Sequence, residues 1–134
     1  MTETVRSGGC LCGQVRYRVR GEPYKSGLCH CADCRQVTGS AFLAYADWRP
    51  SEFEYTGQVA TFKGRSFCPT CGSRLFSLND HQAEIYLGTL DDAPNGIAPL
   101  AEGWVKRREH WLPALPGVLQ YREDIGEQQS PSTE

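Results

Sequence analysis

Short apolar or alternating stretches, separated by turn residues, make up most of this sequence. Residues 14–20 alternate cleanly, with Val15, Tyr17 and Val19 on one face and three arginines on the other, which predicts a half-buried strand. Residues 41–46 form an apolar run of strand length. Further strands are expected at 53–56, 58–63, 65–68, 74–78 and 83–88, with Gly57 joining the first two.

Only two stretches favour a helix, and each is about one turn long. One is 35–39, which a glycine closes, and the other is 48–53, where Pro50 favours the start of a helix. Residues 91–99 are rich in proline, glycine and asparagine and are expected to form a loop. Many short strands without a long helical period predict an all-β fold, a single domain of short antiparallel strands.

Length and composition place limits on this domain. A chain of 134 residues suits one domain with a modest core; we expect residues 1–121 to form it and residues 122–134 to be a disordered polar tail. No apolar run approaches the roughly 20 residues that cross a bilayer, so no membrane partner is expected. Residues 1–4 lack the pattern of a signal peptide. A cytoplasmic location with reduced thiols follows, and the odd number of cysteines also argues against disulfides.

Seven cysteines carry the candidate chemistry. Three of them, Cys29, Cys31 and Cys34, lie within six residues and can converge on one point if the backbone turns back once. Thiolates bind zinc well, and zinc prefers four ligands in a tetrahedron. This group is one ligand short, so a zinc ion here has a position for another protein ligand, water or a substrate.

The other four cysteines form two pairs next to glycines. Cys68 and Cys71 have the spacing of a zinc knuckle, and Cys10 and Cys12 form a tighter pair. The simplest partition joins both pairs in a closed, structural four-thiolate zinc site and leaves the group of three as a second, open zinc site. The alternative joins Cys68 and Cys71 to two of the three clustered thiols and leaves three cysteines unused.

The charge balance argues against a nucleic-acid partner. The formal charge is −2; a four-thiolate zinc adds −4 + 2 = −2 and a three-thiolate zinc adds −3 + 2 = −1, which gives about −5. Domains that bind nucleic acid usually carry a basic surface. The basic residues 106–108, flanked by Trp104 and Trp111, are a short run that is expected to face solvent.

The order of the motifs resembles one known family. The matching motifs are Gly-Gly-Cys-x-Cys-Gly at 8–13, Cys-His-Cys-x-x-Cys-Arg at 29–35, Thr-Gly at 38–39, Phe-Cys-Pro-x-Cys-Gly-Ser at 67–73 and Gly-Thr-Leu-Asp-Asp at 88–92. They are similar to those of the glutathione-dependent formaldehyde-activating enzymes, which include relatives of centromere protein V. The match runs from Gly8 to about Leu119. It implies a β-tent fold, with a structural zinc on the two pairs and a functional zinc on the group of three.

The resemblance also implies a carbon–sulfur lyase activity, the reversible condensation of formaldehyde or another aldehyde with glutathione to S-hydroxymethylglutathione. The three clustered cysteines are then catalytic, because an open zinc site can take the glutathione thiol as a thiolate. One departure bears on the substrate: a segment that is often His-Ile-Trp in the family is Glu102-Gly103-Trp104 here. The rival interpretation is a non-catalytic module that binds zinc or glutathione, since formaldehyde and thiols condense spontaneously.

The reaction needs a proton donor for the alkoxide. His30, Asp33, His81 and His110 have suitable chemistry, but spacing distinguishes none of them, and a solvated or structural role is the alternative for each. Arg35 directly follows the cluster, where it can hold a glutathione carboxylate or form a surface salt bridge.

Overall fold

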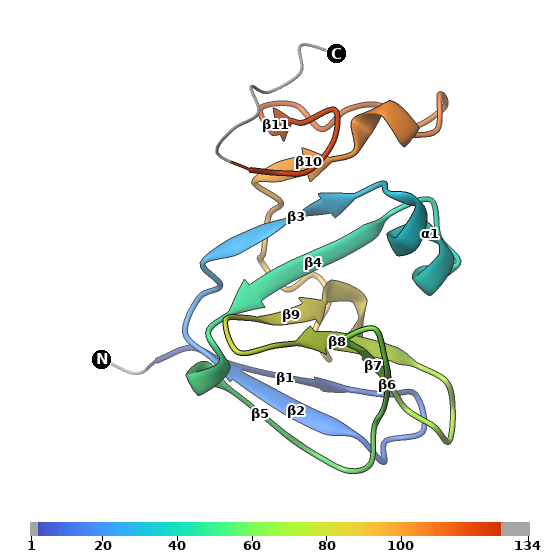
Figure 1. Cartoon of the computed structure of the whole chain (residues 1–134). Helices are drawn as coiled ribbons and strands as arrows, with labels where there is room; N and C mark the ends of the chain where they lie inside the picture. The colour runs from blue at the N-terminus through green and yellow to red at the C-terminus, as the bar shows by residue number, and fades with distance from the viewer. Residues whose placement is uncertain (1–2, 127–134) are drawn as a thin grey trace. The chain divides into compact units, whose positions relative to one another are not determined.

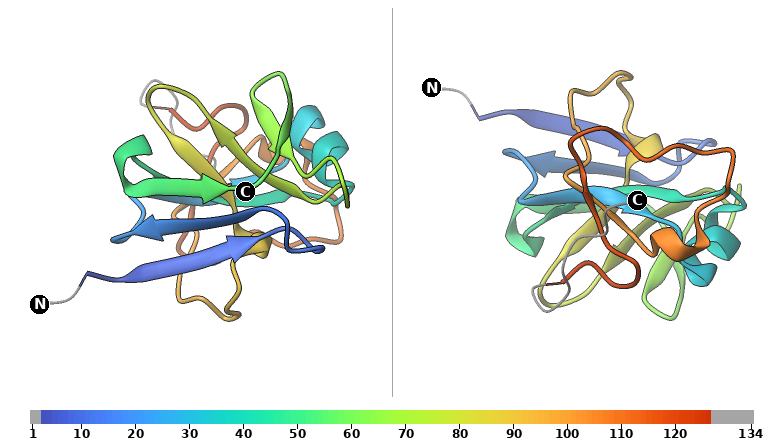
Figure 2. Two further views of the ribbon diagram at one scale, coloured as in Figure 1. Left: turned by 90° about the horizontal axis from the view of Figure 1, so that it is seen from below. Right: turned by 90° about the horizontal axis from the view of Figure 1, so that it is seen from above.

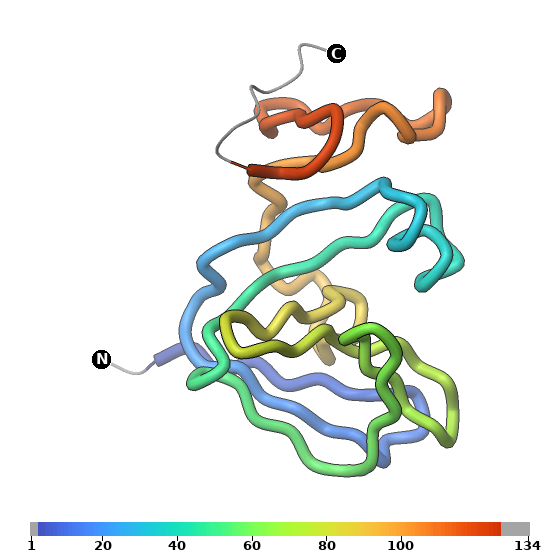
Figure 3. Tube along the Cα trace, viewed as in Figure 1, coloured from blue at the N-terminus to red at the C-terminus, as the bar shows by residue number. Residues whose placement is uncertain are grey.

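The computed structural model of the chain describes residues 3–126, which contain eleven strands, one α-helix and three short 3-10 helices. These residues gather in two compact units. The first unit comprises the described residues up to Lys25 together with Ala46–Ile97, and the second comprises Ser26–Tyr45 and the described residues from Ala98 onward. The chain thus alternates between the units, as the trace in Figure 3 lets the reader follow.

Antiparallel strands make up the first unit. Strand β2 (Arg16–Arg20) lies between β1 (Val5–Gly9) and β5 (Phe53–Thr56) in one sheet, and β1 and β2 run side by side in both views of Figure 2. A second set of strands follows along the chain, each antiparallel to the next: β6 (Ala60–Phe62), β7 (Arg65–Phe67), β8 (Arg74–Leu78) and β9 (Ala83–Tyr86). Two 3-10 helices, η1 (Pro50–Glu52) and η2 (Leu87–Thr89), complete the unit.

The alternation of β2 determines which face of its sheet is buried. Tyr17 and Val19 are 2% and 0% exposed, whereas the arginines between them face outward. Both pack into a cluster with Trp48 and Phe76, and the ring of Phe53 meets that of Phe76 edge-on at a centroid distance of 4.9 Å. Burying an apolar side chain stabilises a fold by about 1.5–3 kcal/mol, so a register slip of one residue in β2 would be strongly disfavoured.

The second unit has its strands in the order β11-β10-β3-β4 (Figure 1). Strand β3 (Lys25–Cys29) leads into helix α1 (Ala32–Thr38), and β4 (Leu43–Trp48) begins here and ends in the first unit. Strand β10 (Ala101–Gly103) is followed by η3 (Val105–Arg107) and β11 (Leu119–Gln120). Strand β10 pairs in parallel with both β3 and β11, so this unit adds parallel pairs to the antiparallel strands that the sequence predicts.

The all-β prediction is confirmed, as are the strands at 53–56 and 74–78 and the helical turn at Pro50. The helix after the cysteine cluster is longer than the predicted turn, since it begins at Ala32. The two strands expected on either side of Gly57 belong to different sheets. Residues 122–134 are predicted by the sequence to be a disordered tail. Within it, the backbone carbonyl of Glu123 accepts a hydrogen bond from the Trp104 N–H at 2.8 Å, and residues 127–134 lie outside the described part of the chain. No helix within residues 3–126 is long and apolar enough to cross a membrane.

Candidate metal centres

Four thiols converge in the first unit. The sulfur atoms of Cys10, Cys12, Cys68 and Cys71 all lie within 4.8 Å of one another, and none forms a disulfide. The Cys12 sulfur is 3.6 Å from that of Cys10 and 3.8 Å from that of Cys68. Sulfurs bound tetrahedrally at about 2.3 Å from zinc lie about 3.8 Å apart, so this donor set fits zinc. The structure thus groups the two pairs as the simplest partition predicted.

Local hydrogen bonds shape the turn of the knuckle. The Gly72 N–H donates to the Cys68 carbonyl at 2.8 Å, and Gly72 adopts a φ of +81°, which glycine tolerates without strain. The backbone N–H groups of Thr70 and Cys71 point at the Cys68 sulfur at 3.3 and 3.4 Å. Burial raises the pKa of Cys68, but these donors outweigh it, and the net pKa is lowered toward the thiolate form that binds metal.

Two polar side chains support the four thiols. The Gln14 amide donates to the Cys68 sulfur at 3.3 Å. The Ser73 hydroxyl accepts a hydrogen bond from the Leu11 N–H at 2.9 Å and lies 3.2 Å from the Cys71 sulfur. The hydrogen bond from Ser73 lowers the pKa of Cys71 to about 5. The sequence assigns no role to either side chain, although Ser73 is the last residue of the motif at 67–73.

Three thiols converge in the second unit, where β3 ends and α1 begins. The sulfurs of Cys29, Cys31 and Cys34 lie within 4.8 Å of one another. Cys31 caps the helix, because its sulfur accepts a hydrogen bond from the Cys34 N–H at 3.3 Å. At the other end, Gly39 in the left-handed conformation donates its N–H to the Arg35 carbonyl at 2.8 Å. A strand end and a helix start therefore bring together three thiols, one fewer than a closed zinc site has.

The three thiols share their protons unequally. The hydrogen bond from Cys34 lowers the pKa of Cys29 to about 6, and the same contact raises the pKa of Cys34. Burial raises the pKa of Cys31. The group thus stabilises one thiolate readily, whereas further negative charge requires a compensating cation. A zinc ion supplies such charge, so this donor set also fits the metal.

His30 lies between two of these thiols in sequence, but it is 0% exposed. Its Nε2 is 2.8 Å from Oε1 of Glu102, which is 1% exposed. Burial lowers the pKa of His30, against the opposing effect of the Glu102 carboxylate. These contacts favour the structural alternative for His30. Glu102, the first residue of the segment that differs from His-Ile-Trp, is therefore a buried residue.

The other candidate residues are more exposed. Asp33 lies in the first turn of α1, and His110 is exposed in the same unit. His81 lies in the turn between β8 and β9 of the first unit, where its N–H donates to Asn79. The Arg35 guanidinium is 2.6 Å from a Glu109 carboxylate oxygen, so the structure shows the salt-bridge alternative for Arg35.

An open hollow of about 520 Å³ lies beside helix α1. Its walls include the Arg35–Glu109 pair and Trp111, which is 70% exposed. Helix α1 also carries Cys34, so this hollow lies against the same helix as one of the three clustered thiols.

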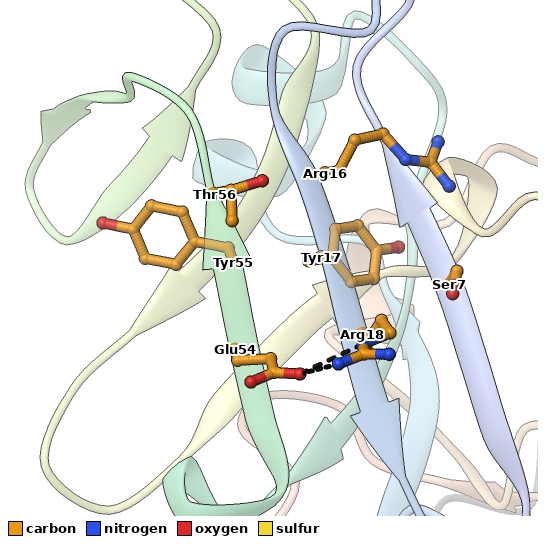
Figure 4. Close-up of a pocket in the computed structure, with 7 residues that line it drawn as sticks. All are labelled: Ser7, Arg16, Tyr17, Arg18, Glu54, Tyr55 and Thr56. Atoms are coloured by element: carbon orange, nitrogen blue, oxygen red, sulfur yellow. Dashed lines mark hydrogen bonds and ion pairs between the residues drawn. The ribbon is translucent and has the colours of Figure 1, made fainter.

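A second hollow, of about 390 Å³, lies in the first unit over strands β1, β2 and β5 (Figure 4). Arg18 points at Glu54 across the two strands, with its Nε 3.0 Å from a carboxylate oxygen. Arg16 is paired with Asp91 in the same way. Both arginines of this hollow are therefore neutralised by acidic partners.

Comparisons with known proteins extend this description. A model of the family described as glutathione-dependent formaldehyde-activating enzyme matches residues 5–107, which include all seven cysteines. A Schizosaccharomyces pombe protein named an uncharacterized lyase is 36% identical over 74 residues, 52% of this chain and 54% of that protein, so the chain spans about half the length of this curated relative. A crystal structure of a Rhodobacter sphaeroides protein matches 69% of this chain and 97% of its own, with a TM-score of 0.52. At 21% identity, that likeness concerns the fold alone.

Proposed function

Because the chain belongs to the glutathione-dependent formaldehyde-activating enzyme family, we propose that it is a zinc-dependent carbon–sulfur lyase-type enzyme acting on glutathione–aldehyde adducts. The reaction is the formation and cleavage of S-hydroxymethylglutathione, or the adduct of another small aldehyde. The observation that carries the proposal is the convergence of Cys29, Cys31 and Cys34 at the junction of β3 and α1. A zinc ion held by these three residues would have one ligand position left for the substrate.

Cys29, Cys31 and Cys34 would hold the zinc ion, whose positive charge would keep an incoming thiol deprotonated at neutral pH. The chain holds the three sulfurs together through the end of β3 and the cap of α1. In the condensation, sulfur forms a bond to the aldehyde carbon, the C=O π electrons move to oxygen, and the oxygen takes a proton. The thiol loses one proton and the oxygen gains one, so the reaction is balanced without a further reactant.

The hollow beside α1 suits a substrate of this class. Its volume lies within the roughly 300–1,000 Å³ of small-molecule sites. Trp111 offers an exposed ring for apolar contact. A substrate carboxylate would compete with Glu109 for the Arg35 guanidinium.

The four-thiolate group has a structural role in this proposal. Cys10 and Cys12 precede β2, whereas Cys68 and Cys71 follow β7, so a zinc ion here joins segments that are distant in sequence. Binding energy at such a site is folding energy, because the unfolded chain does not preform it.

Exchange spectroscopy by NMR tests the activity. At equilibrium, free glutathione and its hydroxymethyl adduct should exchange faster with the zinc-loaded protein, while their populations stay unchanged. The Cys31→Ser variant should lose the acceleration and one zinc ion while keeping the four-thiolate zinc. Binding without acceleration would support the carrier interpretation, and neither binding nor acceleration would overturn the proposal.

A further inference from the structure

Three contacts fix His30, the residue between the first two clustered thiols. Its backbone N–H donates to the Gly103 carbonyl at 3.1 Å, and Gly103 lies opposite Cys29 in the parallel pairing of β10 with β3. Its Nε2 is 2.8 Å from the Glu102 carboxylate. Its ring packs near that of Phe42, with 5.6 Å between the centroids. The loop that carries these two thiols is therefore held through its middle residue.

The Glu102 carboxylate joins four segments of the second unit. Besides the contact with His30, its Oε2 accepts hydrogen bonds from the Leu115 N–H and from the Gln120 side-chain amide, each at 2.9 Å. The Arg108 Nε lies 3.8 Å from its Oε1. The hydrogen bonds from His30, Leu115 and Gln120 offset the cost of burying this carboxylate. An ionised carboxylate can only accept hydrogen bonds, so the contact with Glu102 requires that His30 carry a proton on Nε2.

The rest of this cluster is also ordered around the carboxylate. Gln120 is buried, and its side-chain oxygen accepts a hydrogen bond from Arg108 Nη2 while its nitrogen donates to Glu102. The Arg108 side chain is only 9% exposed. In Glu102→Gln, the buried donors that now face the carboxylate would face an amide. That amide has one acceptor oxygen and two N–H groups of its own.

We propose that Glu102 is a positioning residue for the three-thiol group: through His30, it holds the Cys29–Cys31 loop in the conformation in which the sulfurs converge. The inference rests on the metal centre of the proposed function. Without contacts outside the loop to constrain it, its backbone would be free to sample conformations in which the sulfurs lie apart. The buried carboxylate supplies that constraint in advance of the metal, and this preorganisation strengthens metal binding.

Zinc release to a coloured chelator tests the proposal in the intact, zinc-loaded protein. Glu102→Gln preserves the size of the side chain but removes one acceptor oxygen. Release from the three-thiol group should become about 10- to 100-fold faster, the effect typical of losing an outer-shell partner. Release from the four-thiol group should stay unchanged. The two phases are assigned with Cys31→Ser, which should lack the phase of the three-thiol group.

The matched control is Glu123→Gln, which removes an exposed carboxylate of the same unit that pairs with Lys106. It should change neither phase. Release from the three-thiol group within twofold of wild type in Glu102→Gln would overturn the proposal, as would equal acceleration of both phases, which indicates general loss of structure. A wild-type protein with one zinc ion per chain would overturn the proposed metal centre itself, a failure that the zinc count distinguishes.

A second measurement applies even where Glu102→Gln does not fold. In wild type, nitrogen-15 NMR of the imidazoles should show the proton of His30 on Nε2. Removing zinc from the three-thiol group alone should shift the His30 ring signals, because coupling between two sites is reciprocal. His81, in the other unit, is the internal control and should not shift. Unchanged His30 signals would contradict the inference.

Discussion

Asp47, in β4, carries a buried carboxylate that makes the stability of the fold depend on pH. It is 1% exposed, and neither oxygen has a hydrogen-bond partner among the described residues. Burial raises its pKa from 3.8 to about 6, against an opposing effect of Lys25. Because the pKa of Asp47 is higher in the folded state than in the unfolded state, folding favours the protonated carboxyl. Its contribution to the free energy of unfolding is complete below about pH 3.8 and is lost as the pH rises through about 6. The difference of about 2.2 between the two values corresponds to about 3 kcal/mol.

Asp47→Asn keeps the shape of the protonated acid and removes the charge. We expect the variant to be more stable than wild type by about 1.5 kcal/mol at pH 5 and by about 3 kcal/mol at pH 7. Urea denaturation of the zinc-loaded proteins, at several pH values from 5 to 8 and a fixed zinc concentration, measures both differences. Proton competition at the zinc ligands affects both proteins equally and cancels.

The control is Asp80→Asn, in the exposed turn between β8 and β9. Its stability should stay within about 0.5 kcal/mol of wild type at every pH. The reasoning is refuted if the gain of Asp47→Asn is the same at pH 5 and pH 7, because the carboxylate would then have the same pKa in the folded and unfolded states.

Four further predictions concern the metal centres and the core. Cys68→Ser should give insoluble or poorly packed protein, whereas Cys31→Ser should stay folded with one zinc ion fewer, as metal analysis and thermal melts will show. Glutathione should slow zinc release from the three-thiol group and stabilise the protein by about 2.7 kcal/mol at a hundredfold excess over Kd, less at lower pH, and S-methylglutathione should not. Tyr17→Phe removes a 2.6 Å hydrogen bond to Thr89 and should cost about 1 kcal/mol in urea denaturation. Gly57→Ala would place a Cβ 2.1 Å from a backbone oxygen at a φ of +98°, and should lower the melting temperature by well over 5 °C.

The sequence by itself determined the strands whose evidence is local. Strand β2 could be predicted because Val15, Tyr17 and Val19 alternate with arginines, and a pleated strand buries every second side chain. The grouping of the seven cysteines followed from spacing and from the preference of zinc for four ligands. The alternation of β2 is contained in one short stretch, whereas the partition of the cysteines needed the spacing within each pair and a count of ligands. The sulfur positions agree with that partition.

Tertiary structure decided what depends on distant residues. His30 and Glu102 are 72 positions apart, and only the parallel pairing of β10 with β3 brings them within a hydrogen bond. Strand β10 has three residues, too few for a period to be recognised. A glutamate in such a stretch is ordinarily expected at the surface, since burying a charge is costly. Its hydrogen-bond partners are His30, the Leu115 N–H and Gln120 of β11, and the energy of a buried charge depends on partners whose positions only the folded chain defines.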